Sequence, residues 1–205
     1  MESFYYAGVR RGSFLHKLLE SWADTLCKYE EIMYPSDLPY LYRERTNVGF
    51  LASAATKLGA LVLEEFSCNK KRGRKQRPGR ADLWIWAGGK APDYQFEAKY
   101  ISPNARTKPL ESEIKEALKE ATKDICKIPM HDRAEDWVGI GIVFVVPYFP
   151  RRREFSSNQL RNRLLHISSL NADFCAIHFC QGELQATTPH CFPCVAIVGK
   201  YVKCP

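Results

Sequence analysis

The segment Val138–Val146, with the sequence VGIGIVFVV, constrains the fold more than any other part of the chain. It is almost wholly apolar, but it is too short to cross a membrane and contains glycines, which is typical of a buried strand. A strand with apolar side chains on both faces must be covered on both faces, and helices supply that cover in α/β proteins. The segment therefore predicts the central strand of a sheet flanked by helices.

The other predicted elements are compatible with such a sheet. Apolar residues at three- and four-residue spacing predict helices over Ser13–Met33, about Leu41–Leu58 and Leu110–Ile128, and Gly59 is suited to end the second. Further patterns predict strands over Ala60–Ser67, Ala81–Ala87, Tyr94–Ile101, Ala172–Phe179 and Cys194–Val202, and a short helix near Ser157–Ile167. The fold class that follows is α/β, with a mixed central sheet flanked by helices.

The length of 205 residues fits a single domain, and no internal repeat or domain boundary is evident. We expect residues 1–40 to form an N-terminal helical extension, 41–147 the core that carries the chemistry, and 148–205 the C-terminal strands that complete the sheet. The N-terminus lacks an apolar signal core, so a cytoplasmic location without membrane association is expected. The eight cysteines show no regular framework, which favours reduced thiols.

The net charge of +7 is concentrated in two segments. Asn69–Arg80 contains seven basic and no acidic residues, and Pro150–Arg163 contains five arginines and one glutamate. Together they carry +11, which leaves −4 on the rest of the chain. Focused positive charge favours a polyphosphate partner, and two solvated loops are the alternative. The candidate nucleic-acid ligands are Lys70, Lys71, Arg72, Arg74, Lys75, Arg77, Arg80, Arg151, Arg152 and Arg153.

The predicted strand Tyr94–Ile101 places Glu97 and Lys99 on one face, because side chains alternate along a strand. A Gly88-Gly89 turn predicts a hairpin with the preceding strand, which begins with Asp82. The Asp82 and Glu97 carboxylates would then converge and repel each other unless a cation lay between them.

Oxygen ligands with open positions favour Mg²⁺ or Mn²⁺ as that cation. A lysine beside such a metal can hold the attacking water or stabilise the charge that builds on a phosphate during hydrolysis. The alternative is that Gln95, Glu97 and Lys99 form a solvent-exposed strand face and that Asp82 is a turn residue.

Asp82, a fourteen-residue gap and Glu97-Ala98-Lys99 resemble the PD-(D/E)xK motif of the restriction-endonuclease-like superfamily. The order of predicted elements from the second helix to Val146 also resembles the αβββαβ core of that family. The resemblance implies that Asp82, Glu97 and the main-chain carbonyl of Ala98 bind the metal and that Lys99 is catalytic. One departure is that Ala81 stands where the motif has proline.

Many members of the family also carry an acidic residue on the first core helix. Glu44 lies one turn before Val48, on the predicted apolar face of that helix, and is our candidate for a fourth catalytic residue. Glu65, near the end of the first predicted strand, competes with it.

Trp84 and Trp86 share a predicted strand face with Asp82. They could stack on bases, but large aromatic residues in a central strand are more often core residues. If they are core residues, a twist or bulge must turn the Asp82 carboxylate away from them.

Two cysteine and histidine sets could be assembled into a zinc site, but neither has regular spacing. Cysteine in an apolar strand behaves as a small hydrophobe, which favours a core role for the second set. The sets are His190, Cys191, Cys194 and Cys204, and Cys175, His178 and Cys180.

The chain has no Gly-x-Ser-x-Gly motif, which argues against a serine hydrolase of that type, and no glycine-rich phosphate loop. These patterns together predict a metal-dependent nuclease that hydrolyses phosphodiester bonds, in DNA rather than RNA. A homodimer would match the two-fold symmetry of duplex DNA for double-strand cutting. The alternatives are a catalytically inactive nucleic-acid-binding module of the same fold and a protein-interaction module whose basic segments bind an acidic protein.

Overall fold

A seven-stranded mixed sheet organises the computed structural model, which describes residues 3–33, 37–72, 75–89, 92–105, 109–129, 136–150, 156–180 and 189–202. Its strands are β1 (Phe4–Ala7), β2 (Leu61–Arg72), β3 (Lys75–Trp86), β4 (Asp93–Ile101), β5 (Trp137–Val145), β7 (Phe174–Phe179) and β9 (Cys194–Val202). They lie in the order β1-β7-β9-β5-β4-β3-β2, and only β4 and β5 pair in parallel. Strands β6 (Phe149–Pro150) and β8 (His190–Cys191) form a separate two-stranded sheet.

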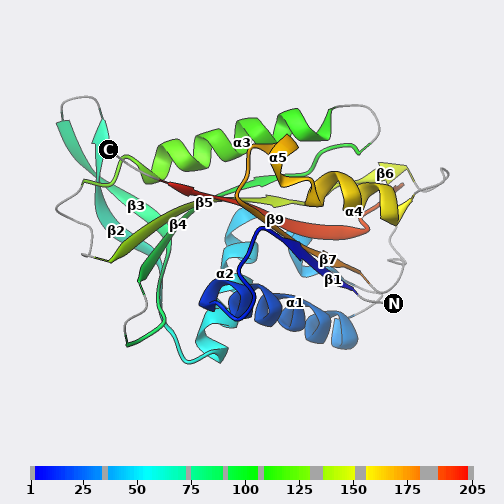
Figure 1. The fold of residues 1–205 in the computed structure, drawn as a ribbon, viewed down its shortest axis with the longest axis horizontal. Coiled ribbons are helices and arrows are strands. Elements are labelled where there is room, and N and C mark those ends of the chain that lie inside the picture. Colours follow the sequence, from blue (N-terminus) through cyan, green and yellow to red (C-terminus); the bar gives the residue numbers. More distant parts are fainter. Residues whose placement is uncertain are drawn as a thin grey trace.

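Helices cover both faces of the large sheet, as the apolar segment Val138–Val146 predicts (Figure 1). One face carries α1 (Phe14–Met33) and α2 (Arg43–Lys57), with the short 3-10 helix η1 (Pro39–Leu41) before α2. The other face carries α3 (Leu110–Ile125), α4 (Ser157–Leu165) and α5 (Ile167–Leu170). The mixed α/β architecture is therefore confirmed. Among the described residues, no helix combines the length and the apolar character needed to cross a bilayer.

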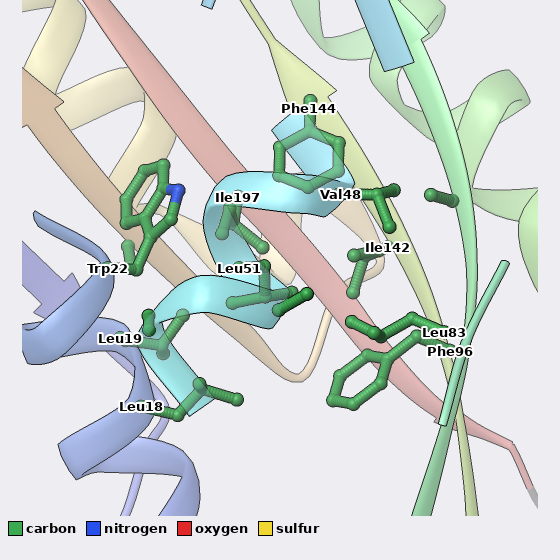
Figure 2. Close-up of a cluster of buried hydrophobic side chains, with 14 of the residues drawn as sticks. Leu18, Leu19, Trp22, Val48, Leu51, Leu83, Phe96, Ile142, Phe144 and Ile197 are labelled. Carbon is green, nitrogen blue, oxygen red and sulfur yellow. The ribbon is translucent and has the colours of Figure 1, made fainter. Parts of the chain in front are cut away.

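The main core lies between the sheet and the helices α1 and α2. Figure 2 shows side chains from both helices converging on side chains from the strands. Each fully buried large apolar side chain contributes about 2 kcal/mol to the free energy of unfolding. The labelled side chains are Leu18, Leu19, Trp22, Val48, Leu51, Leu83, Phe96, Ile142, Phe144 and Ile197.

The described part of the basic segment Asn69–Arg80 is not a solvated loop, the alternative that the sequence left open, but paired strand. Strands β2 and β3 continue through it as a two-stranded ribbon, paired from Leu61↔Trp86 to Arg72↔Lys75. The ribbon persists because it rests on the C-terminal end of α3 and the turn that follows, where the Lys71 N–H donates a hydrogen bond to the Lys127 carbonyl at 2.7 Å. The described cations of the segment are thus carried on paired strands: Lys70, Lys71, Lys75, Arg77 and Arg80.

Strand β1 has no counterpart among the predicted elements, so residues 1–40 contribute to the sheet as well as to the helical layer. It pairs with β7 at the edge of the sheet, with Phe4 opposite His178. Its four residues are too few to show the alternating pattern from which a strand is predicted.

Trp84 and Trp86 are not part of the main core, contrary to the expectation for a central strand. The core positions of β3 are Leu83 and Ile85, which are fully buried. Trp84 is half-buried and Trp86 is 37% exposed. The reason is strand alternation: α1 and α2 cover the leucine and isoleucine face, and the tryptophans point the other way.

We expect Gly141→Ala to lower the free energy of unfolding by about 1–3 kcal/mol, as overpacked sites do. An added Cβ would lie 2.8 Å from the main-chain nitrogen of Thr122 in α3, so the helix would have to move away from β5. Gly49→Ala is the matched control, because its Cβ would meet Glu64 at an ordinary 3.7 Å. It should gain up to about 1 kcal/mol from helix propensity. Urea denaturation measures both, and an undiminished stability of Gly141→Ala would contradict this close approach.

Candidate active site

Asp82 lies at the point where β3 parts from β4. The paired residues of these strands run from Trp86↔Asp93 to Leu83↔Phe96 and stop there. Just beyond, Asp82 Oδ2 accepts a hydrogen bond of 2.7 Å from the main-chain N–H of Ala98. The carboxylate is thereby fixed against β4, beside Glu97. The hairpin thus brings Asp82 to the Glu97-Ala98-Lys99 segment, as predicted.

A local irregularity gives Asp82 this orientation. The ladder between β2 and β3 omits the pair that Glu65 and Asp82 would form, and Glu65 has a φ of 44°. That left-handed conformation is costly for a residue other than glycine. Leu83 packs in the main core whereas Ala81 packs against Ile125 of α3 on the opposite face, although a regular strand would place both on one face. The strand is therefore irregular at Asp82, although the tryptophans whose burial was to require such an irregularity are not core residues.

Glu97 is buried, with 2% of its surface exposed. The ammonium of Lys70, from the basic ribbon, donates a hydrogen bond of 2.6 Å to Glu97 Oε1. Gln95, on the same strand face, is also buried and accepts a hydrogen bond of 2.7 Å from Trp137 Nε1. The alternative in which these side chains form a solvent-exposed strand face is therefore wrong.

Lys99 is held by an aspartate that the sequence analysis did not identify. Its Nζ lies 3.1 Å from Asp124 Oδ2 of α3, and Lys127 Nζ lies 2.5 Å from the other oxygen. Burial tends to raise the Asp124 pKa, but the hydrogen bonds from Lys127 and Lys99 outweigh it and lower that pKa. Burial likewise opposes the Lys99 charge, yet Asp124 raises its pKa, so Lys99 is a cation at neutral pH. One feature of the sequence could have pointed to Asp124. It directly precedes Ile125, an apolar residue on the buried face of the predicted helix Leu110–Ile128.

The structure distinguishes the two candidates for the fourth acidic position. Glu44, in the first turn of α2, is half-buried, and its pKa is raised by burial and then by the charge of Asp82. Lys99 acts on the same carboxyl in the opposite direction. Glu65 instead pairs with Arg45 at 3.3 Å and with Arg80 at 3.2 Å. Among charged groups, Asp82 and Lys99 therefore act most strongly on Glu44, with smaller effects from Asp124 and Glu65, whereas Glu65 itself pairs with two arginines.

Burial disfavours the charged form of both carboxyl groups of the site. Burial, followed by the charge of Asp82, raises the pKa of Glu97 from 4.5 to about 7, even though Lys70 and Lys99 lower it. Burial also raises the Asp82 pKa, which the Ala98 N–H and the two lysines counteract. Carboxylates in this condition gain from an added cation.

The donor set suits a hard divalent cation that keeps part of its water shell. Among the described residues, Asp82 Oδ1 and Glu97 Oε2 accept no hydrogen bond, so each carboxylate has an oxygen to offer. In the same part of the chain, no three His, Cys, Asp or Glu side chains form a ready metal-binding group. Two carboxylates, a main-chain carbonyl and solvent oxygens would instead have to complete the shell, as Mg²⁺ accepts.

The basic ribbon leads directly to this site. Lys71, Lys75, Arg77 and Arg80 are exposed, and within the described ranges only Arg80 of these four forms an ion pair. Lys70 points inward to Glu97. The other candidate ligands cannot be placed: Arg74, Arg151, Arg152 and Arg153, and the side chain of Arg72, lie outside the described residues.

Cys175 and His178, which belong to one of the candidate zinc sets, contact other parts of the protein. Cys175 is fully buried in an apolar cluster of β7, and His178 Nε2 lies 3.0 Å from Glu30 Oε1 of α1. Burial opposes the charge of His178, but hydrogen bonds to Cys27 and Glu30 raise its pKa to about 9. The imidazole of His178 is thus paired with a carboxylate of α1. Cys204, from the other set, lies outside the described residues.

The chain matches no protein-family model, and comparison with curated proteins and with solved structures gave no match. What it does must therefore be inferred from the geometry of its own residues.

We expect the stability of the metal-free protein to depend on pH through Glu97. Its folded pKa, about 7, exceeds its ordinary value of 4.5, so the folded state holds the proton more tightly. This contribution to stability is complete below pH 4.5 and is lost as the pH rises through 7. In chelator, the free energy of unfolding should fall over that range by on the order of 2 kcal/mol more than in Glu97→Gln, which cannot titrate.

Urea denaturation at a series of pH values measures this difference. Glu64→Gln is the control, because Glu64 is an exposed carboxylate two residues before Phe66 on the same ribbon. Equal pH slopes for the parent protein and Glu97→Gln would show that Glu97 does not carry the effect.

Proposed function

We propose that this protein is a metal-dependent nuclease of the PD-(D/E)xK type that hydrolyses phosphodiester bonds in DNA. The observation that carries the proposal is the convergence of Asp82 and Glu97, two largely buried carboxylates with raised pKa values, beside the Lys99 cation. Such clusters of perturbed groups are characteristic of catalytic sites.

The order of elements offers independent support. From α2 to β5 the chain runs helix, three strands, helix and strand, with β4 and β5 parallel and adjacent. This is the order that the αβββαβ core requires. Within this order Asp82 lies in the second of the three strands and Glu97 and Lys99 lie in the third, which supports the proposed core.

Each residue has a defined task in the proposed reaction. Asp82, Glu97 and the Ala98 carbonyl would hold Mg²⁺ or Mn²⁺, which when bound activates water and neutralises phosphate charge. Lys99 is protonated, so it acts as a hydrogen-bond donor to the attacking water or to a phosphate oxygen rather than as a base. Asp124 positions the Lys99 ammonium. Glu44 adds negative charge near Asp82 and Lys99.

The ribbon supports a nucleic-acid substrate. It carries the exposed side chains Lys71, Lys75 and Arg77 on paired strands, and the same ribbon brings Lys70 to the site. Exposed cations of this density bind phosphates and release counterions. A two-stranded ribbon also fits the dimensions of the major groove of duplex DNA, which favours DNA over RNA.

One observation favours the second candidate function, a nucleic-acid-binding module without chemistry. Glu97 already has a cation in Lys70, and Lys99 already has an anion in Asp124. Metal-independent pairing of this kind would suffice for a purely structural site. The cleavage experiment that follows separates the two functions.

We expect Asp82→Ala and Lys99→Ala each to reduce cleavage by at least about 100-fold while leaving nucleic-acid affinity nearly unchanged. Asp82→Ala removes a metal ligand, and Lys99→Ala removes the donor for water or phosphate. The assay follows cleavage of single-stranded, duplex and branched DNA and of RNA, with Mg²⁺, with Mn²⁺ and with chelator. Undiminished cleavage by a pure preparation of either variant would contradict the assignment. Binding without cleavage of every substrate would favour the inactive module.

Glu44→Gln and Glu65→Gln test the fourth acidic position. We expect Glu44→Gln to slow cleavage by about tenfold or more, because it removes a charge coupled to Asp82 and Lys99. Glu65→Gln should stay near the parent rate, because Glu65 contacts arginines at the base of the ribbon. The opposite ranking in a single-turnover assay would assign the position to Glu65.

A further inference from the structure

Lys70 differs from the other cations of the ribbon in where its charge lies. Its side chain is only 17% exposed, and its Nζ lies 2.6 Å from Glu97 Oε1. A charge-assisted hydrogen bond this short is strong, more so because the Glu97 side chain is almost fully buried. Lys70 is therefore part of the carboxylate site rather than of the exposed surface.

The ribbon backbone holds Lys70 in this position. Alternation sends Lys70 towards the site and Lys71 to the exposed side, and the Lys71 N–H is anchored to the Lys127 carbonyl at 2.7 Å. The aliphatic stem of Lys70 lies over Gly79, where an added Cβ would come within 3.0 Å of Lys70 Cδ. A glycine on the partner strand thus makes room for a lysine that reaches inward.

In this position Lys70 competes with a divalent cation for the same carboxylate. Its ammonium occupies one oxygen of Glu97, the carboxylate that would bind the metal in the proposed nuclease. A divalent cation on the free oxygen of Glu97 and the ammonium on Oε1 would repel each other across one buried carboxylate. Lys70 therefore weakens metal binding for as long as its ammonium stays on Glu97.

We propose that Lys70 is the resident counter-ion of the metal site, which competes with a divalent metal for Glu97, and that it takes no part in binding nucleic acid while the site is metal-free. The inference rests on the proposed function, because the competing metal is that of the nuclease site. It divides the ribbon cations into one internal competitor, Lys70, and an exposed phosphate-binding group, Lys71, Lys75 and Arg77. Metal affinity and metal-free nucleic-acid affinity are then controlled by adjacent residues.

The first measurement is calorimetric titration with Mn²⁺ alone, without nucleic acid. Lys70→Met keeps the aliphatic stem over Gly79 but removes the charge, and it should bind Mn²⁺ about tenfold more tightly than the parent protein. Lys70→Gln, a second variant without the charge, should do the same and guards against a folding defect in the first. Lys71→Met, the matched neighbour, should bind Mn²⁺ like the parent, and Glu97→Gln should lose the site.

The second measurement is binding of a short DNA duplex in chelator over a range of salt concentrations. Lys71→Met should weaken binding and reduce the salt slope by about one, as loss of a phosphate contact does. Lys70→Met should match the parent in both respects.

The outcomes are distinguishable. Unchanged Mn²⁺ affinity in both Lys70 variants, with the site still lost in Glu97→Gln, would overturn the role of Lys70 and leave the nuclease proposal intact. Metal-free duplex binding that falls as much in Lys70→Met as in Lys71→Met would also overturn it. Absence of Glu97-dependent Mn²⁺ binding from every variant would refute the proposed metal-dependent nuclease and this inference with it.

Discussion

The hydrogen bond from the Ala98 N–H to the Asp82 carboxylate is the contact on which the candidate site depends. It replaces a strand-to-strand bond at the place where β3 and β4 separate, so the ladder continues through a side chain. The same separation lets the ribbon of β2 and β3 change faces, which carries Ala81 to α3 and Lys70 to Glu97. The strained backbone of Glu65 is the local cost of that arrangement.

Sequence periodicity predicted most of the sheet and its helices, because long elements with one buried face leave a clear pattern. It failed where tertiary contacts determine the outcome. The ribbon contains seven basic residues and resembles a loop, yet partner-strand pairing and the support of α3 keep it ordered. The exposure of Trp86 has the same origin. Alternation divides the side chains of β3 between two faces, but it does not say which face the helices α1 and α2 will cover.

Strand alternation predicts that Glu97 and Lys99 share one face, and the hairpin turn predicts that Asp82 lies near them. The partners of these residues were not predictable in the same way. Asp124 and Lys70 come from elements far apart in the sequence, and they reach the site only because α3 and the ribbon pack on the same face of β4. A pair of acidic residues can therefore be predicted from the pattern of two strands. Their counter-ions cannot, because those residues are brought in by the packing of elements far apart in the sequence.

Strand β2 forms an outer edge of the large sheet, and its position there gives the ribbon cations a second consequence. An uncovered edge invites another chain to add a strand, and lysines along it are a common deterrent to such aggregation. At Lys71 the edge is already covered, because its N–H bonds to the Lys127 carbonyl, and the exposed Lys71 charge adds a second deterrent to self-association besides being a candidate phosphate ligand. Variants stripped of several ribbon charges should lose colloidal stability along with nucleic-acid affinity, and a monodisperse preparation is a precondition for interpreting them.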